Sequence, residues 1–96
     1  MKTFELAFLP SALKEWRHLD NTVREQFKNK LAERLQNPRI QSARLSGMPD
    51  CYKIKLTALG YRLVYRVVDS TITVVVVAVG KRERSAAYSV ALLRLR

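Results

Sequence analysis

Cationic side chains on two neighbouring segments are the residues of this sequence best placed to do chemistry. Lys53 and Lys55 alternate with apolar residues, and Arg62 follows a short segment at 57–60 that ends in glycine. If 57–60 is the turn of a β-hairpin, Lys55 lies opposite Arg62, and strand alternation puts Lys53 on the same face. The spacing therefore predicts three cations close together on one face of a sheet.

A further strand is expected over residues 72–79, and it extends this cluster. Pairing across a turn at Asp69-Ser70 would bring Arg62 near Val77 and leave Arg82 just past the strand's end. Like charges directly opposite each other destabilise a sheet, and no carboxylate is in register to relieve them. The side chains either spread into water, where repulsion is weak, or surround an anion. A phosphate would accept bidentate hydrogen bonds from arginine and point-charge contacts from lysine.

Other residues could add binding surface to this cluster. Tyr88 lies one turn into a predicted last helix, where it could stack on an unpaired base, although packing against the sheet is equally compatible with its spacing. A broader basic surface is predicted to contact phosphates, with an ordinary solvated helix face as the alternative for its helical members. Its members are Arg24, Lys28, Lys30, Arg34, Arg39, Arg44, Lys81 and Arg84.

Composition favours a polyanionic partner and excludes several kinds of site. The 96 residues, expected to form one domain over 1–96, include 18 Lys plus Arg against 8 Asp plus Glu, a net charge of +10. The longest apolar run, 72–79, is far too short to span a membrane, and no signal pattern begins the chain. Cys51 is the only cysteine, so no internal disulfide can form. A cytoplasmic location is therefore expected. His18 is the only histidine, and the sequence has no metal-ligand cluster and no nucleotide-binding motif. An enzyme of this sequence is therefore expected to work without a metal or cofactor, using Lys, Arg and Tyr side chains.

The elements that must position these residues follow from periodicity and turn signals. Phe4, Leu6 and Phe8 alternate as one buried face of a first strand, and Pro10 suits the first turn of a helix. A second helix should begin at 20–22, with Thr22 and Glu25 at capping-box spacing, and end at Asn37-Pro38. After an irregular segment at 38–50, the expected strands are 51–56, 61–68 and 72–79, followed by a helix over 85–95.

The predicted fold class is therefore α+β, in the order β-α-α-β-β-β-α. The sheet should have four strands, mostly antiparallel, with an N-terminal helical hairpin on one face and a C-terminal helix, and the helices are expected against one face. The face that carries Arg62 should also carry Val64, Val75, Val77 and Val79. Such a face is too apolar to stay bare, so the last helix or an acidic partner segment should cover it.

Five segments of the chain carry distinctive motifs: Gly47-Met-Pro-Asp-Cys-Tyr-Lys-Ile-Lys-Leu56, Gly60-Tyr-Arg-Leu-Val-Tyr65, Val79-Gly-Lys-Arg-Glu-Arg-Ser85 with Tyr88, Ala12-Leu-Lys-Glu-Trp-Arg17 and Thr22-Val-Arg-Glu-Gln26. Together they resemble the RelE toxins. The resemblance covers essentially the whole chain and these motifs are specific. It implies an endoribonuclease that cuts mRNA in the A site of the 70S ribosome, where the protein would also contact 16S rRNA. It also implies a RelB-like antitoxin that neutralises the toxin and binds operator DNA with it.

The resemblance also implies roles for individual residues. Lys53, Lys55, Arg62, Arg82 and Tyr88 match the family's catalytic positions. The implied reaction is attack of a ribose 2′-OH on its own 3′ phosphate, with Lys55 as candidate base because neighbouring cations disfavour its protonated form. Ser46 stands where close relatives carry arginine, which puts substrate or ribosome affinity in question. A ParE-type topoisomerase poison, which shares the fold but not the cation set, and a non-catalytic RNA-binding module are the alternatives.

Overall fold

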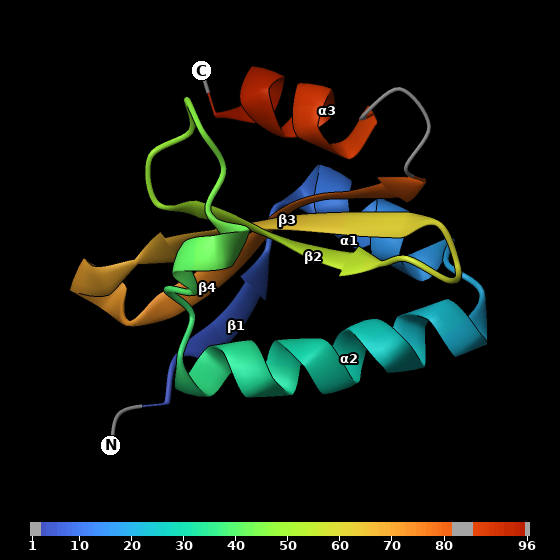
Figure 1. Ribbon diagram of the computed structural model, residues 1–96, viewed down its shortest axis with the longest axis horizontal. Coiled ribbons are helices and arrows are strands. Elements are labelled where there is room, and N and C mark those ends of the chain that lie inside the picture. The colour runs from blue at the N-terminus through green and yellow to red at the C-terminus, as the bar shows by residue number, and fades with distance from the viewer. Residues whose placement is uncertain (1–2, 82–85, 96) are drawn as a thin grey trace.

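The computed structural model describes residues 3–81 and 86–95 and has a four-stranded sheet at its centre (Figure 1). The strands lie in the order β1-β4-β3-β2, with β1 parallel to β4 and the other neighbours antiparallel. The elements in chain order are β1 (Glu5–Phe8), α1 (Pro10–Arg17), α2 (Asn21–Gln36), β2 (Cys51–Leu56), β3 (Tyr61–Val68), β4 (Thr73–Lys81) and α3 (Ala86–Arg94). Two 3₁₀ turns, Gln41–Ala43 and Asp69–Thr71, precede β2 and β4. The predicted α+β fold and element order are confirmed.

The helices begin and end near the positions that the sequence predicts. Pro10 is the first residue of α1, where its missing N–H costs no hydrogen bond. In α2, Val23, Phe27 and Leu31 are buried at four-residue steps, and the helix ends two residues before Pro38. The predicted capping box was wrong: Thr22 lies inside α2, and the N-cap is Asp20, whose side chain makes no capping hydrogen bond.

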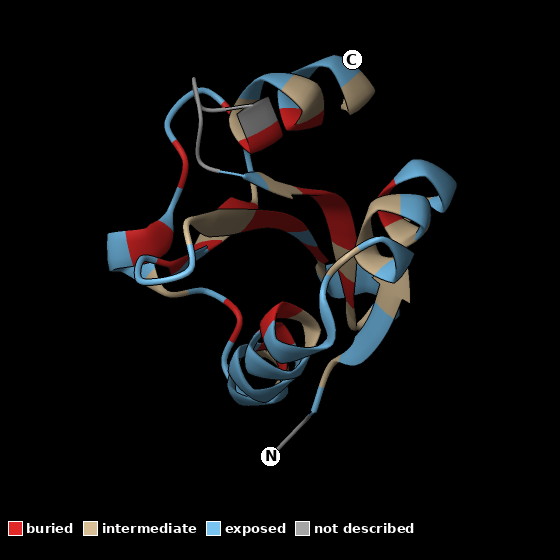
Figure 2. Ribbon diagram, turned by 90° about the vertical axis from the view of Figure 1, so that its right-hand side faces the viewer, coloured by how far each residue is buried: buried red, intermediate tan, exposed pale blue. Residues whose placement is uncertain are grey.

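Helices cover both faces of the sheet, so the expectation that all of them lie against one face was wrong. Figure 2 shows α2 on one side of the sheet and α3 on the other, with buried residues between them. One core joins α1 and α2 to the sheet through residues that include Ala12, Phe27 and Tyr65. A second, smaller core lies between α3 and the opposite face, around Val64, Val77, Ala78, Ala87 and Ala91. The last helix therefore covers the apolar face, which is one of the two alternatives expected from the sequence; the other was an acidic partner segment.

The register of β4 differs from the prediction. Arg62 pairs with Gly80 instead of Val77. The turn before β4 is longer than two residues, since it includes the 3₁₀ turn and Ile72, whose φ is 51°. Val64 then pairs with Ala78 while Tyr65 pairs with Val76, so Val77 is an extra residue, a β-bulge.

The bulge also changes which side chains share a face. Val77 packs with Val64 under α3, as predicted, but Val79 packs in the core of α1 and α2. The prediction that Val79 shares the Arg62 face was therefore wrong. One added residue reverses the facing of everything beyond it, because side chains alternate with a period of two.

The remaining differences lie at element ends and at the sheet's edge. The first strand is shorter than expected, and Leu6 is 40% exposed because β1 is an edge strand. Strand β4 runs to Lys81 and not to Val79. No helix in the described part of the chain has the length and apolar character needed to cross a membrane.

Candidate active site

Three cations lie together on the face of the sheet that α3 covers. Lys55 pairs with Arg62 across the β2–β3 hairpin, and Lys53 pairs with Val64, which packs beneath α3. The predicted hairpin register is thus confirmed. Lys55 is exposed, and Lys53 and Arg62 are half-buried. Within residues 3–81 and 86–95, none of the three forms a salt bridge.

A small hollow lies at the hairpin end of this cluster. Its volume is about 90 Å³. The turn that shapes it uses Gly60, whose φ of 72° falls in the left-handed region that glycine adopts without strain. The residues that line the hollow are Lys55, Leu56, Thr57, Gly60, Tyr61 and Arg62. Two unpaired cations on the wall of an open hollow can hold an anionic group such as a phosphodiester.

Tyr88 lies against the cluster from the α3 side. The Arg62 Cζ atom is 5.2 Å from the centroid of the Tyr88 ring, within cation–π range. The Tyr88 hydroxyl is buried and makes no hydrogen bond of good geometry among the described residues, although the Arg62 guanidinium lies close enough to act on its pKa. Burial raises the pKa of Tyr88, while the positive charge of Arg62 opposes that shift. A neutral ring with a cation on it is therefore built into the site. The remaining predicted catalytic residue, Arg82, lies outside the described residues, as does Arg84.

Three members of the predicted basic surface are engaged within the molecule. Arg24 donates to the carbonyl oxygens of Arg17 and Leu19, which lie where α1 ends, and to the Asn21 side chain. Its guanidinium satisfies backbone acceptors left open at the end of a helix. The structure therefore gives Arg24 a role in joining α1 to α2.

Arg34 connects α2 to the sheet. Its Nη1 donates to the Lys53 carbonyl oxygen at 3.1 Å and to the Tyr65 hydroxyl at 2.9 Å. The Tyr65 hydroxyl in turn donates to the Pro38 carbonyl oxygen at 2.6 Å. This half-buried guanidinium holds the strand that carries Lys53 and Lys55, so it supports the site from behind.

Arg39 is paired with two carboxylates. Its guanidinium donates to Asp69 at 2.5 Å and to Asp50 at 3.0 Å, and to the Tyr52 hydroxyl. These hydrogen bonds, first the one with Asp69, raise the pKa of Arg39. The arrangement neutralises Arg39 and ties the segment before β2 to the β3–β4 turn.

The other described members of the basic surface remain at the surface. Lys30, Arg44 and Lys81 are exposed, and Lys28 makes an exposed contact with Glu25 at 3.5 Å. Exposed pairs of this kind contribute little, so Lys28 is available to a phosphate. Sequence reasoning did not single out Arg66, which alternates with Arg62 along β3 and is exposed on the same strand. Continuing the alternation two positions past Val64 would have found it.

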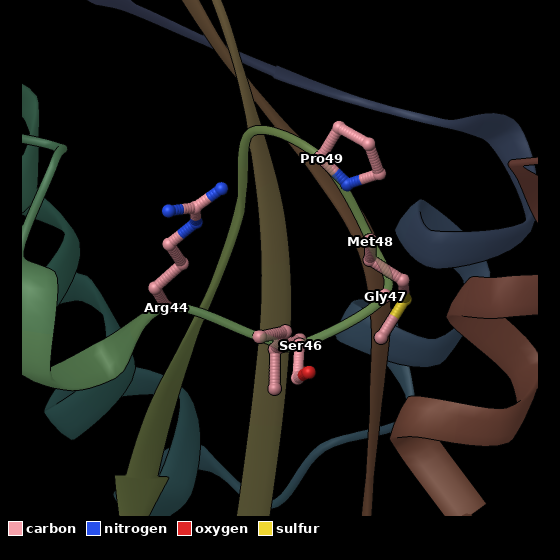
Figure 3. Close-up of a pocket in the computed structure, with 6 residues that line it drawn as sticks. Arg44, Ser46, Gly47, Met48 and Pro49 are labelled. Atoms are coloured by element: carbon pink, nitrogen blue, oxygen red, sulfur yellow. The ribbon is translucent and has the colours of Figure 1, made fainter.

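A larger hollow lies away from this cluster. The loop at 44–49 encloses about 490 Å³, and Figure 3 shows it as an arc with Arg44 at one end and Pro49 at the other. Ser46, the departure from the family pattern, lies on this arc. The loop leads into the start of β2, whereas Lys55 lies near that strand's end, so the two features are at opposite ends of the sheet (Figure 1). Among the described residues, no group of three or more His, Cys, Asp or Glu side chains could hold a metal ion.

Comparisons with known proteins agree with this geometry. Residues 6–86 match the family model described as the ParE toxin of the type II toxin–antitoxin system parDE. The mRNA interferase toxin RelE of Escherichia coli K12 is 60% identical over 90 residues, covering 94% of this chain and 95% of that protein.

Solved structures give the same relationship. A free arginine-to-alanine double mutant of E. coli toxin RelE superimposes with a TM-score of 0.90 at 55% identity, covering 98% of this chain and 99% of the other. RelE in the intact E. coli RelBE toxin–antitoxin complex has a TM-score of 0.81 at 59% identity, covering 84% and 99%. With this identity over nearly its whole length and a family match over residues 6–86, the chain belongs to the RelE toxins, within the ParE toxin family of type II toxin–antitoxin systems.

Proposed function

We propose that this protein is an endoribonuclease that cuts mRNA in the ribosomal A site, without a metal ion, and so stops translation. The observation that carries the proposal is Lys55 opposite Arg62 on one face, with Lys53 beside them and the Tyr88 ring under Arg62. The E. coli relative is an mRNA interferase toxin, which supports the same reaction class. The +10 charge suits a partner as anionic as the ribosome.

The proposed reaction transfers a phosphoryl group within the RNA. The ribose 2′-oxygen forms a bond to its own 3′ phosphorus, and the bond to the 5′-oxygen of the next nucleotide breaks. Lys55, as a neutral amine, takes the proton of the 2′-OH. Lys53 and Arg62 stabilise the charge that develops on the phosphorane. The products are a cyclic phosphate and a 5′-oxygen, which takes a proton from solvent to become a 5′-OH. Arg82, which lies outside the described residues, is proposed to stabilise the departing 5′-oxygen, and Tyr88 to stack on a base.

The ribosome is proposed to supply the geometry that the protein lacks. No histidine or carboxylate belongs to the described cluster, and an exposed lysine is a poor base in free solution. Holding the message with its 2′-OH in line with the departing oxygen converts a rare arrangement into a fixed one, which can contribute about 7–11 kcal/mol. Cleavage of free RNA should therefore be slow.

A RelB-like antitoxin is the proposed protein partner. The support is the intact E. coli RelBE complex, whose toxin is 59% identical to this chain. We infer that operator DNA is bound only through the antitoxin complex. Co-purification of this protein with the product of an adjacent gene tests the partnership, and a toxin that remains active with every such product present would contradict it.

Single-turnover cleavage on translating ribosomes, with enzyme in excess, tests the proposed function. Lys55→Ala should slow cleavage at saturation by about 10²–10⁴-fold, because a lost general base costs that much. Its ribosome affinity should stay near that of the wild type, since one lysine contributes little to a large RNA interface. Lys14→Ala is the matched control, because Lys14 is an exposed lysine on α1 without an assigned role. A Lys55→Ala protein that cuts at the wild-type rate when saturating would leave the cluster only a binding role.

A topoisomerase poison is the second candidate, because the matched family model is described as ParE. Mapping of RNA ends on ribosomes, beside a topoisomerase supercoiling assay, separates the two. Toxicity that depends on Lys55 without any RNA cleavage, together with inhibited supercoiling, would favour the poison. Ribosome binding without new RNA ends would favour a plain RNA-binding module.

A further inference from the structure

We propose that Glu15 and Arg94 are positioning residues of the site: together they hold α3, and with it Tyr88, on the bulged part of β4. The two side chains come from opposite ends of the chain, on α1 and on the last turn of α3. The role in cleavage rests on the proposed function; the role in holding α3 does not.

The contact between Glu15 and Arg94 is bidentate and partly shielded from water. Arg94 Nη1 donates to Glu15 Oε1 at 2.9 Å, and Nη2 donates to Oε2 at 3.1 Å. The side chains of Arg94 and Glu15 are only 21% and 31% exposed. This two-point geometry fixes direction as well as distance, and lower exposure reduces screening by solvent and salt.

Both side chains also bind backbone groups at the β-bulge. Arg94 Nη1 donates to the Val77 carbonyl oxygen at 2.7 Å, and Glu15 Oε1 accepts from the Val79 N–H at 3.1 Å. These groups lie past Val76, the last residue of β4 that pairs with β1. Val77 is also the residue that has no partner on β3. The pair therefore provides hydrogen bonds to two backbone groups that no neighbouring strand reaches. Without these hydrogen bonds, the partly buried groups would be unsatisfied and would destabilise the fold.

Helix α3 needs this attachment because its own apolar contact is small. It has nine residues, and isolated helices below ~12–15 residues are marginal in water. Its fully buried described side chains are two alanines, Ala87 and Ala91, while Leu92 and Leu93 are 44% and 63% exposed. Tyr88, Val90 and Leu95 also pack against this core but are only partly buried, so the apolar contact of α3 is limited and the ion pair adds to it.

Tyr88 depends on the same attachment. It lies on α3 less than two turns before Arg94, and its ring contacts Arg62 only while the helix lies on the sheet. Figure 1 shows α3 running from the end of the sheet with the β2–β3 turn back across the face. Releasing the Arg94 end lets the helix lift and removes the ring from the cation cluster. The bulge, held by the same two side chains, also sets the register that places Gly80 beside Arg62.

Two measurements on the full-length protein test this. In hydrogen exchange of the free protein, Glu15→Ala and Arg94→Ala should each lower amide protection in α3 by about ten- to hundredfold, the effect of a lost charge-assisted contact. Protection in β2 and β3 should change far less. Glu33→Ala, an exposed glutamate on α2 with no salt bridge among the described residues, is the matched control. Arg94→Lys keeps one donor and the charge, so it should restore part of the protection.

The second measurement is single-turnover cleavage on saturating ribosomes, which isolates the action through Tyr88. Glu15→Ala should slow the saturated rate without weakening ribosome binding. Adding Glu15→Ala to Tyr88→Ala should slow it no further, since the second change removes what the first one positions. Unchanged α3 protection in both alanine variants would overturn the proposal, as would fully additive rate effects. A wild-type protein that does not cut would overturn the proposed function instead, and the exchange measurement would still decide the role of the pair.

Discussion

The Tyr88 hydroxyl is a buried polar group that makes no hydrogen bond of good geometry among the described residues, and this makes its removal informative. Tyr88→Phe keeps the ring over which Arg62 lies and removes a group whose burial is unfavourable. We expect its thermal stability to equal or exceed that of the wild type and its saturated cleavage rate to remain close to normal. Tyr88→Ala should lose about 1–3 kcal/mol of base stacking, about ten- to hundredfold in rate.

Thermal unfolding and single-turnover cleavage of the two variants check this prediction together. Similar rates for Tyr88→Phe and Tyr88→Ala would assign the hydroxyl, not the ring, to the reaction. A marked loss of stability in Tyr88→Phe would mean that the hydroxyl is satisfied in solution.

Ser46 is the second residue whose substitution is informative. It is exposed on the 44–49 loop, beside Arg44 and at the far end of the sheet from Lys55. We predict that Ser46→Arg strengthens ribosome binding and steepens its dependence on salt by about one counterion, without changing the saturated cleavage rate. Ser42→Arg, at an exposed position in the preceding 3₁₀ turn, is the control for added charge alone. Equal gains from both variants would show that position 46 is not special.

At the scale of elements, Arg34 separates stability from RNA binding. Arg34→Ala removes donors from the Lys53 carbonyl oxygen and the Tyr65 hydroxyl, so we expect a loss of about 1–3 kcal/mol in the free energy of unfolding. Lys30→Ala, on the exposed side of the same helix, should change it by less than about 0.5 kcal/mol. Urea unfolding of both variants measures the difference. If Arg34→Ala and Lys30→Ala lowered the free energy of unfolding by equally small amounts, Arg34 would be better described as a member of the basic surface, as the sequence predicts.

The elements also show which features could be predicted from local pattern. The β2–β3 hairpin follows from alternation and a glycine-containing turn, so the pairing of Lys55 with Arg62 was predictable. The β4 register was not, because the bulge at Val77 is held by Glu15 and Arg94, which are 79 positions apart. Likewise, helical spacing put Arg24 and Arg34 on a polar face, but it could not tell a solvated arginine from one that binds a distant backbone carbonyl.

At the scale of the whole molecule, net charge sets the range of attraction to RNA. The +10 charge predicts ribosome binding that weakens steeply between low and moderate salt, because each phosphate contact releases counterions. The Lys28→Ala/Lys30→Ala double variant should lower the slope of log affinity against log salt by about two, without altering the saturated cleavage rate. Binding titrations at four or five salt concentrations measure the slope. A slope near zero in the wild type would remove the electrostatic basis of the proposed interface.

Three proton-binding groups predict how the whole fold responds to alkaline pH. Burial raises the pKa of the Cys51 thiol, of the Tyr65 hydroxyl and of the Tyr88 hydroxyl above their ordinary values of 9.0 and 10.0. Between the unfolded and folded values the native protein binds more protons than the unfolded chain. The free energy of unfolding therefore falls as pH rises in that range. These contributions are complete below about pH 9 and are lost as pH climbs through the folded values.

Urea unfolding from pH 7 to 11 should thus show a plateau followed by a decline that begins near the ordinary pKa of a thiol. Cys51→Ala removes the group that titrates first, so it should delay the onset of the decline toward pH 10, although the buried cavity lowers stability at every pH. Ala12→Gly, a cavity of similar size at a buried position without a titrating group, separates the two effects. The free energy of unfolding of Ala12→Gly should be lower than that of the wild type at every pH, but its decline should begin at the same pH as in the wild type. If the Cys51→Ala decline began at the same pH as that of Ala12→Gly, the thiol would not be the group whose ionisation opens the fold.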